Sequence, residues 1–172
     1  MTVVTGNWTG RVIHAAMDSR GLGRWSYITI VGRAGTRLTI ITAYQVCKQS
    51  PQSAGPDTAY QQQWRILRFE GNNTPEPRKQ FMKDLTNFIK ELRQQQNHEV
   101  ILMMDANDHP LDRGSQLSRF AQETNMVDIH AVMHGTENEP NTYQRGSRRI
   151  DFMFCSPGLT QHINKSGIEG FC

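Results

Sequence analysis

An aspartate and an asparagine stand two residues apart at the end of a short apolar run. Asp105 and Asn107 follow Val100–Met104 (VILMM), the longest purely aliphatic stretch of the chain. If that run is a strand, residues two apart project to the same side. A carboxylate can take a proton from water or hold a metal ion, and an adjacent amide can hold that water or donate to a phosphoryl oxygen. The pair could act on a phosphate, although Asp and Asn are also ordinary residues of a strand-ending turn.

A second pattern places charges on an apolar strand. In Arg148–Phe154 (RRIDFMF), Arg149 and Asp151 alternate with apolar residues and are predicted to share the opposite face. Such a pair must face water, a partner or a site, and the alternatives are a salt bridge or protection of an edge strand. Arg145, Arg148 and Arg149 form a basic cluster that could meet phosphate or simply be a solvated face.

A tyrosine ends another β-prone run. Tyr44 closes Arg37–Tyr44 (RLTIITAY). Its phenol could donate to a phosphate, or it could be a half-buried packing residue with a wet tip.

The elements that must position these residues follow from composition and period. Arg24–Gly32 and Arg37–Tyr44 are rich in β-branched and aromatic residues and flank a short Gly-containing turn, which predicts a β-hairpin. Thr9–Ala15 is predicted as a further strand, and Gln45–Asp57 as an exposed loop. Val100–Met104 is predicted as a strand covered on both faces.

Helices are expected between these strands. Tyr60–Phe69 is predicted to be one. For the next, we predict Thr74 as N-cap, Pro75 at the first helical position and Asn97 as C-cap. Its buried stripe comprises Phe81, Met82, Leu85, Phe88, Ile89 and Leu92. A short helix is marked by Leu117, Phe120 and Ala121. The prediction is a single α/β or α+β domain with a largely antiparallel sheet.

Composition narrows the class of protein. The 172 residues include 19 basic and 16 acidic ones, giving a formal net charge of +3 and a pI of about 8.9. This balance argues against a disordered chain and permits an anionic partner. No membrane span or secretory signal is expected, which predicts an intracellular protein, cytoplasmic or nuclear. Cys47, Cys155 and Cys172 lack metal-ligand spacing, so neither a disulfide framework nor a zinc site is expected.

Four motifs in order resemble the endonuclease/exonuclease/phosphatase superfamily, the fold of deoxyribonuclease I. They are a strand ending at Tyr44, a helix opened by Tyr60-x-x-x-Trp64, an apolar strand followed by Asp105-x-Asn107, and Arg149-Ile-Asp151-Phe-x-Phe154. The resemblance covers roughly Trp25 to Leu159 and is nearest to endonuclease-like domains of retroelement-derived proteins. It implies a four-layered α/β/β/α sandwich of mixed, largely antiparallel sheets, incomplete here at its first and last strands.

The resemblance also implies roles for single residues. Asp105 would activate or orient the attacking water, and Asn107 would contact phosphate or nucleophile. Tyr44 would position the phosphate, and Asp151 would orient a catalytic histidine. The basic cluster, apart from the resemblance, predicts Arg148 and Arg149 as phosphate-binding residues. Mg²⁺ or Mn²⁺ is the expected cofactor, with Asp105 as the best candidate ligand, and the expected substrate is a nucleic-acid phosphodiester, with DNA favoured.

The sequence also departs from the superfamily pattern. A strand with the metal-binding Glu and a closing Ser-Asp-His motif are both absent. We therefore expect a fragment with little activity alone, which could belong to a larger retroelement-type polyprotein. Two alternatives remain open: a degenerate, non-catalytic domain that binds nucleic acid, and a structural or interaction module in which the motifs are coincidental.

Overall fold

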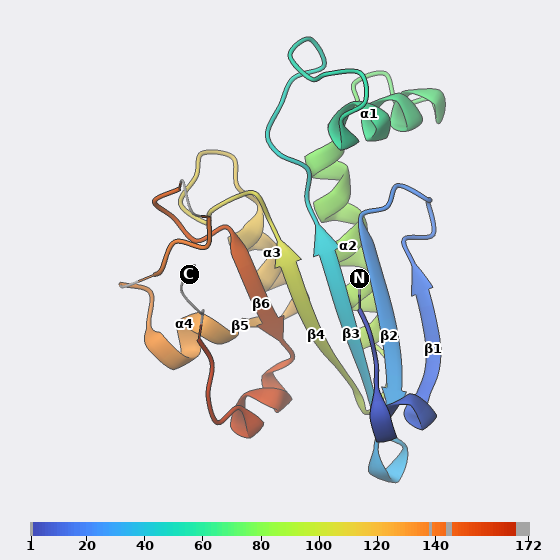
Figure 1. Ribbon diagram of the computed structural model, residues 1–172, viewed down its shortest axis with the longest axis vertical. Coiled ribbons are helices and arrows are strands. Elements are labelled where there is room, and N and C mark those ends of the chain that lie inside the picture. The colour runs from blue at the N-terminus through green and yellow to red at the C-terminus, as the bar shows by residue number, and fades with distance from the viewer. Residues whose placement is uncertain (1, 138, 144–145, 168–172) are drawn as a thin grey trace.

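The chain is described by a computed structural model for residues 2–137, 139–143 and 146–167. Six strands form one mixed sheet in the order β1-β2-β3-β4-β6-β5 (Figure 1). The β3–β4 pair is parallel and the other pairs are antiparallel. The strands are β1 (Val12–Met17), β2 (Trp25–Val31), β3 (Arg37–Tyr44), β4 (His98–Asp105), β5 (Val127–Asp128) and β6 (Asp151–Cys155).

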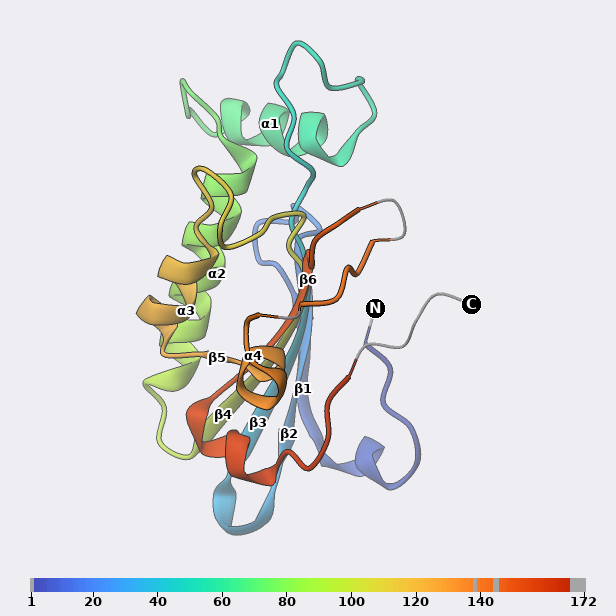
Figure 2. The same cartoon turned by 90° about the vertical axis from the view of Figure 1, so that its left-hand side faces the viewer.

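Helices cover one face of this sheet. The α-helices are α1 (Ala59–Phe69), α2 (Pro77–Arg93), α3 (Leu117–Thr124) and α4 (Ile129–His134). Figure 2 shows α2 and α3 on one side of the sheet, with the N-terminal residues and the short 3-10 helix Gly6–Arg11 on the other. None of the described helices is long and apolar enough to cross a membrane.

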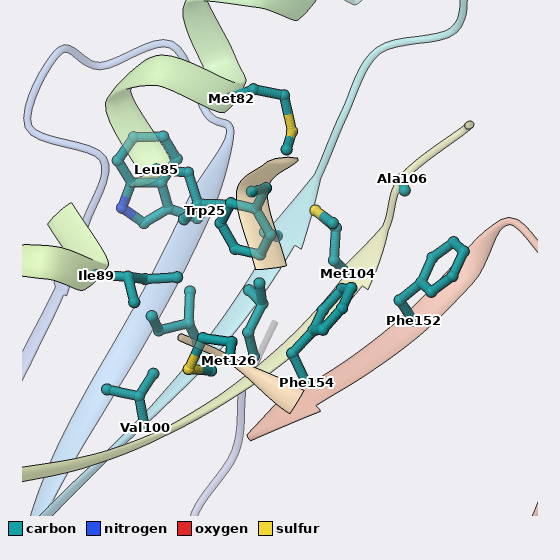
Figure 3. Packing of buried hydrophobic residues seen from close by; sticks show 14 of the residues in the cluster. Trp25, Met82, Leu85, Ile89, Val100, Met104, Ala106, Met126, Phe152 and Phe154 are labelled. Carbon is teal, nitrogen blue, oxygen red and sulfur yellow. The ribbon is translucent and has the colours of Figure 1, made fainter. Parts of the chain in front are cut away.

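The core lies between the sheet and its helices. Alternate residues of β4 and β6 point towards the helices, as Val100, Met104 and Phe154 do in Figure 3. Leu85, Ile89 and Leu102 have no exposed surface. Phe120 and Phe154 pack edge to face at 5.6 Å between ring centroids. Burial of Val100, Leu102 and Met104 confirms the apolar strand predicted around Val100–Met104. Among the described residues the strand is fully covered on one face only, not on both as predicted, since Ile101 and Met103 are half-buried. This alternation explains why Asp105 faces away from α2 and α3.

The predicted α/β class with a largely antiparallel sheet is confirmed, as is the hairpin formed by β2 and β3. Of the four layers that the resemblance implies, the described residues form one sheet and one layer of helices. The first predicted strand is shifted, because Thr9 belongs to a 3-10 turn and its hydroxyl donates to Gly6 O. The short β5 and α4 were not predicted.

The predicted caps of the long helix are wrong. α2 begins at Pro77, not Pro75, with Glu76 as its N-cap. A residue before proline is pushed out of the helical region, and Glu76 is non-helical (φ −123°, ψ 88°). The helix ends at Arg93, while Asn97 takes a positive φ of 56° and its carbonyl accepts from Arg37 N–H in the turn that leads into β4.

Candidate functional site

Three of the predicted site residues lie in one row across the sheet. Tyr44 on β3 is paired in register with Asp105 on β4, which is paired with Asp151 on β6. Cross-strand partners project to the same face, so the phenol and the two carboxylates meet on the face that the helices leave uncovered. Parallel pairing of β3 and β4 explains this meeting, because both strands end at the same edge.

Asn107 joins this row through a turn, not through an extended strand. Its backbone N–H donates to Asp105 Oδ1 at 3.1 Å, and its φ is 43°, a left-handed conformation that asparagine tolerates. Its Nδ2 donates to Gln45 O at 2.8 Å, and Cys47 Sγ donates to its Oδ1 at 3.3 Å. The side chain therefore ties the end of β4 to the end of β3 and is already engaged within the chain.

The two carboxylates lack a counter-ion among the described residues. Neither Asp105 nor Asp151 forms an ion pair there, in contrast to most nearby acids. Burial first, and then the charge of Asp151, raise the pKa of Asp105, against the hydrogen bond from Asn107. Burial, followed by Cys47 and Asp105, raises the pKa of Tyr44, so the phenol keeps its proton. A carboxyl with a raised pKa is a better proton acceptor.

Arg149 forms salt bridges, the alternative that the sequence analysis left open, and is not an exposed phosphate ligand. Its side chain is 1% exposed, and it forms ion pairs with Asp128 and Glu139 instead of facing water. Its guanidinium also stacks over Phe152 at 4.2 Å. Arg148 is exposed and pairs with Asp112, and Arg145 lies outside the described residues.

β6 begins only at Asp151 because the amides of Ile150 and Asp151 both donate to Thr142 Oγ1.

A cavity of about 630 Å³ lies in front of the row. It is lined mainly by apolar surface of β3, β4 and β6, together with Tyr44, Asp105 and Asp151. It also contains Thr142 and His130, which the sequence analysis missed because neither stands in a recognisable pattern. His130 Nε2 is buried, and no described residue forms a hydrogen bond with it. Burial, with help from Arg149 and His134, lowers the pKa of His130, which favours its neutral form.

Metal-ion ligands in this part of the chain are few. No group of three or more His, Cys, Asp or Glu side chains suited to a metal occurs within the described ranges. The paired carboxylates of Asp105 and Asp151 nevertheless fit Mg²⁺, which keeps several waters and is commonly held by one or two carboxylates. Their mutual repulsion, which no ion pair among the described residues relieves, is the feature that a bound cation would offset.

Comparisons with known proteins agree on the fold. No protein-family model matches the sequence, and no curated protein matches it. The catalytic domain of human Nocturnin with bound sulfate is similar at 15% identity and a TM-score of 0.55, covering 86% of this chain and 49% of that one. The endonuclease domain of TRAS1, a telomere-specific non-LTR retrotransposon, is 14% identical over 86% of this chain and 57% of that one, with a TM-score of 0.48.

A Bacteroides thetaiotaomicron protein of the endonuclease/exonuclease/phosphatase family is 16% identical over 77% of this chain and 41% of that one, with a TM-score of 0.47. This chain thus spans about half the length of the structures it matches. The described sheet and its helices have the deoxyribonuclease I-like fold of the endonuclease/exonuclease/phosphatase structures.

Proposed function

We propose that this chain is part of a metal-dependent phosphodiesterase of the endonuclease/exonuclease/phosphatase type that acts on nucleic acid. The observation that carries the proposal is the single row formed by Tyr44, Asp105 and Asp151 at one edge of the sheet. Two adjacent carboxylates without a counter-ion, beside a protonated phenol, suit a cation and a phosphate better than they suit folding. The fold shared with Nocturnin supports the same assignment.

Each residue has a role in this proposal. Asp105 accepts the proton of the attacking water or orients it, and Tyr44 donates a hydrogen bond to the phosphate. Asn107 fixes the ends of β3 and β4 relative to each other. Its side-chain amide is the one that the proposal places nearest the phosphate. The negative charge of Asp151 helps to raise the pKa of Asp105. Arg148 is the exposed cation available to a phosphate, whereas the buried Arg149 positions the start of β6.

A divalent cation, Mg²⁺ or Mn²⁺, would be held by Asp105 with Asp151. It would supply positive charge to offset the charge that develops on the leaving oxygen. The basic pI of about 8.9 and the retroelement-like resemblance favour DNA as the substrate.

A binding and cleavage assay tests the proposal. We expect a labelled DNA oligonucleotide to bind more tightly in Mg²⁺ than in EDTA. We also expect the chain to nick supercoiled plasmid slowly in Mg²⁺. The double variant Asp105→Asn/Asp151→Asn should lose the Mg²⁺ effect and the nicking. Asp57→Asn/Glu91→Gln, which removes two exposed carboxylates that form no ion pair among the described residues, is the matched control. Equal Mg²⁺ dependence in wild type and double variant would contradict the proposal.

Binding without turnover is the second candidate function. It is favoured by one observation: no histidine in the described parts of the chain hydrogen-bonds to Asp151, since His109 is engaged with Glu139 and His134 with Ser166. In that case DNA binding would depend on salt, and plasmid nicking would be absent from wild type and variants alike.

A further inference from the structure

A second pocket lies on the other side of the same strand ends. Its volume is about 230 Å³, and it includes Gln45 and Asp108, the residues that follow Tyr44 and Asn107. Gln45 N–H donates to Asp105 O at 2.8 Å, so the pocket begins one residue beyond the candidate site. None of the roles proposed above uses it.

Two helices direct their N-termini at this pocket. Glu76, Pro77, Arg78 and Lys79 at the start of α2 line it, and so does Gln116, the N-cap of α3. Neither helix has a side-chain cap hydrogen bond or an acidic residue in its first turn. By contrast, Thr58 caps α1 and Asp128 caps α4 through side-chain oxygens.

The first amides of these two helices are therefore available. In α2, Pro77 has no N–H, and the first backbone bond is Gln80 N–H to Glu76 O. In α3, Leu117 N–H donates to Ser115 Oγ at 3.3 Å, and the next backbone bond is Phe120 N–H to Gln116 O. Free amides and the positive end of the helix dipole favour an anion at such a point.

Basic side chains outnumber acidic ones around the pocket. Lys48, Arg78, Lys79 and Arg113 line it against Glu76 and Asp108. Arg78 pairs with Asp108 at 3.2 Å, and Lys79 pairs with Glu76 at 2.5 Å. No ion pair of Lys48 or Arg113 occurs among the described residues. The pocket thus keeps two cations that are not neutralised by its own acids.

A buried acceptor completes the pocket. Gln45 is 2% exposed, and its Nε2 donates to Arg78 O at 3.3 Å. Its Oε1 is buried and has no hydrogen-bond partner among the residues that the structure describes. A buried carbonyl without a donor is costly, so a ligand here should offer a hydroxyl or amino donor as well as negative charge.

We propose that this pocket binds a nucleotide phosphate, with an adjacent sugar hydroxyl donating to Gln45 Oε1. The amides that begin α2 and α3 and the side chains of Lys48 and Arg113 bind the phosphate oxygens. As a phosphate subsite for a strand that continues past Asp105, the assignment rests on the proposed function. As a pocket for a phosphate and its sugar, it stands on these contacts alone.

The test uses the ¹⁵N-labelled chain in EDTA, so that no metal-dependent chemistry enters. Inorganic phosphate, adenosine and adenosine 5′-monophosphate are titrated, and amide shifts are followed by NMR. We expect both phosphates to shift the amides of Arg78, Lys79, Ser118 and Arg119, and the nucleotide to bind more tightly than either part. Lys48→Ala/Arg113→Ala should weaken nucleotide binding about tenfold or more, as expected for two lost charge-assisted contacts.

A matched control separates this pocket from general attraction to a basic protein. Arg33→Ala/Arg65→Ala also removes two exposed cations, both outside the pocket, and should leave the affinity unchanged. Equal weakening in the two double variants, or shifts elsewhere with none at α2 and α3, would overturn the proposal.

Two further variants sharpen the assignment. Gln45→Met should reduce the affinity for the nucleotide to that for inorganic phosphate; an unchanged preference for the nucleotide would remove the sugar contact from the proposal. Asp105→Asn/Asp151→Asn should leave binding here unchanged, so failure of the proposed function and failure of this pocket are separate results.

Discussion

Two acidic regions lie on either side of the start of β6, and they are built differently. On one side, Asp128 and Glu139 hold the buried guanidinium of Arg149. Burial raises the pKa of Glu139, but the hydrogen bonds and charges of His109 and Arg149 together lower it below its ordinary value. On the other side, Asp105 and Asp151 face each other across β4 and β6 without a cation, and the pKa of Asp105 is raised.

The difference separates structural charge from functional charge. A buried ion cluster holds the chain together when each member has partners. A pair of like charges beside a cavity weakens the fold and is retained where a ligand needs it. Opposite pKa directions for Glu139 and Asp105 therefore favour a structural role for the first region, called the brace below, and support the proposal of a site at the second.

Removing the central cation of the brace should have the largest effect. Arg149→Met leaves Asp128 and Glu139 facing each other, and we expect a loss of about 3–5 kcal/mol in the free energy of unfolding. Arg148→Met, at an exposed neighbour, should change it by less than about 0.5 kcal/mol. Urea denaturation measures both.

Neutralising Asp128 and Glu139 tests whether their unpaired charges cause the loss of stability in Arg149→Met. Arg149→Met/Asp128→Asn/Glu139→Gln should recover most of the stability, since no unpaired charge remains and asparagine can still cap α4. A triple variant as unstable as Arg149→Met would show that packing over Phe152, not charge, dominates.

Thr142 links the two regions, and its hydroxyl should matter next. Thr142→Val keeps the shape but deprives the amides of Ile150 and Asp151 of their acceptor. We expect a loss of about 1–2 kcal/mol, measured by urea denaturation, whereas Thr142→Ser should stay close to wild type. A loss in Thr142→Ser as large as that in Thr142→Val would contradict this, because serine keeps the hydroxyl that accepts from the two amides.

The site itself should respond in the opposite direction. Asp105→Asn removes one of two facing charges and keeps an oxygen that can accept from Asn107 N–H, so we expect a gain of about 1 kcal/mol at neutral pH. The same variant should abolish any nicking. A thermal melt beside Asp112→Asn checks the gain, and a loss of stability would break the contrast between brace and site.

The smallest effect is the pH dependence of that gain. The folded state raises the pKa of Asp105 above its ordinary value of 3.8, so the fold disfavours the ionised form. Its destabilising effect is present above the raised pKa and disappears as pH falls below 3.8, where the carboxyl is protonated in both states. The difference in melting temperature between Asp105→Asn and wild type should therefore shrink from pH 7 to pH 4. A constant difference would contradict this.

Local pattern predicted much of the fold. The β2–β3 hairpin, the amphipathic stripe of α2 and the apolar β4 followed from side-chain period, because burial on one or both faces imposes that period. The ends of the elements followed less well from pattern. Pro75 and Pro77 both suit the first helical position, and the non-helical backbone of Glu76 places the start of α2 at Pro77. β5 spans two residues, too few for any period to register.

The site divides in the same way. The sequence by itself determined which polar residues end the strands, since Tyr44, Asp105 and Asp151 interrupt apolar alternation where no packing demand explains them. Only the tertiary structure decided that they share one row, because strand register depends on pairing between segments far apart in the chain. It also buried Arg149 against Asp128 and Glu139, and it brought the starts of α2 and α3 to one pocket, because long-range packing fixes which charges meet.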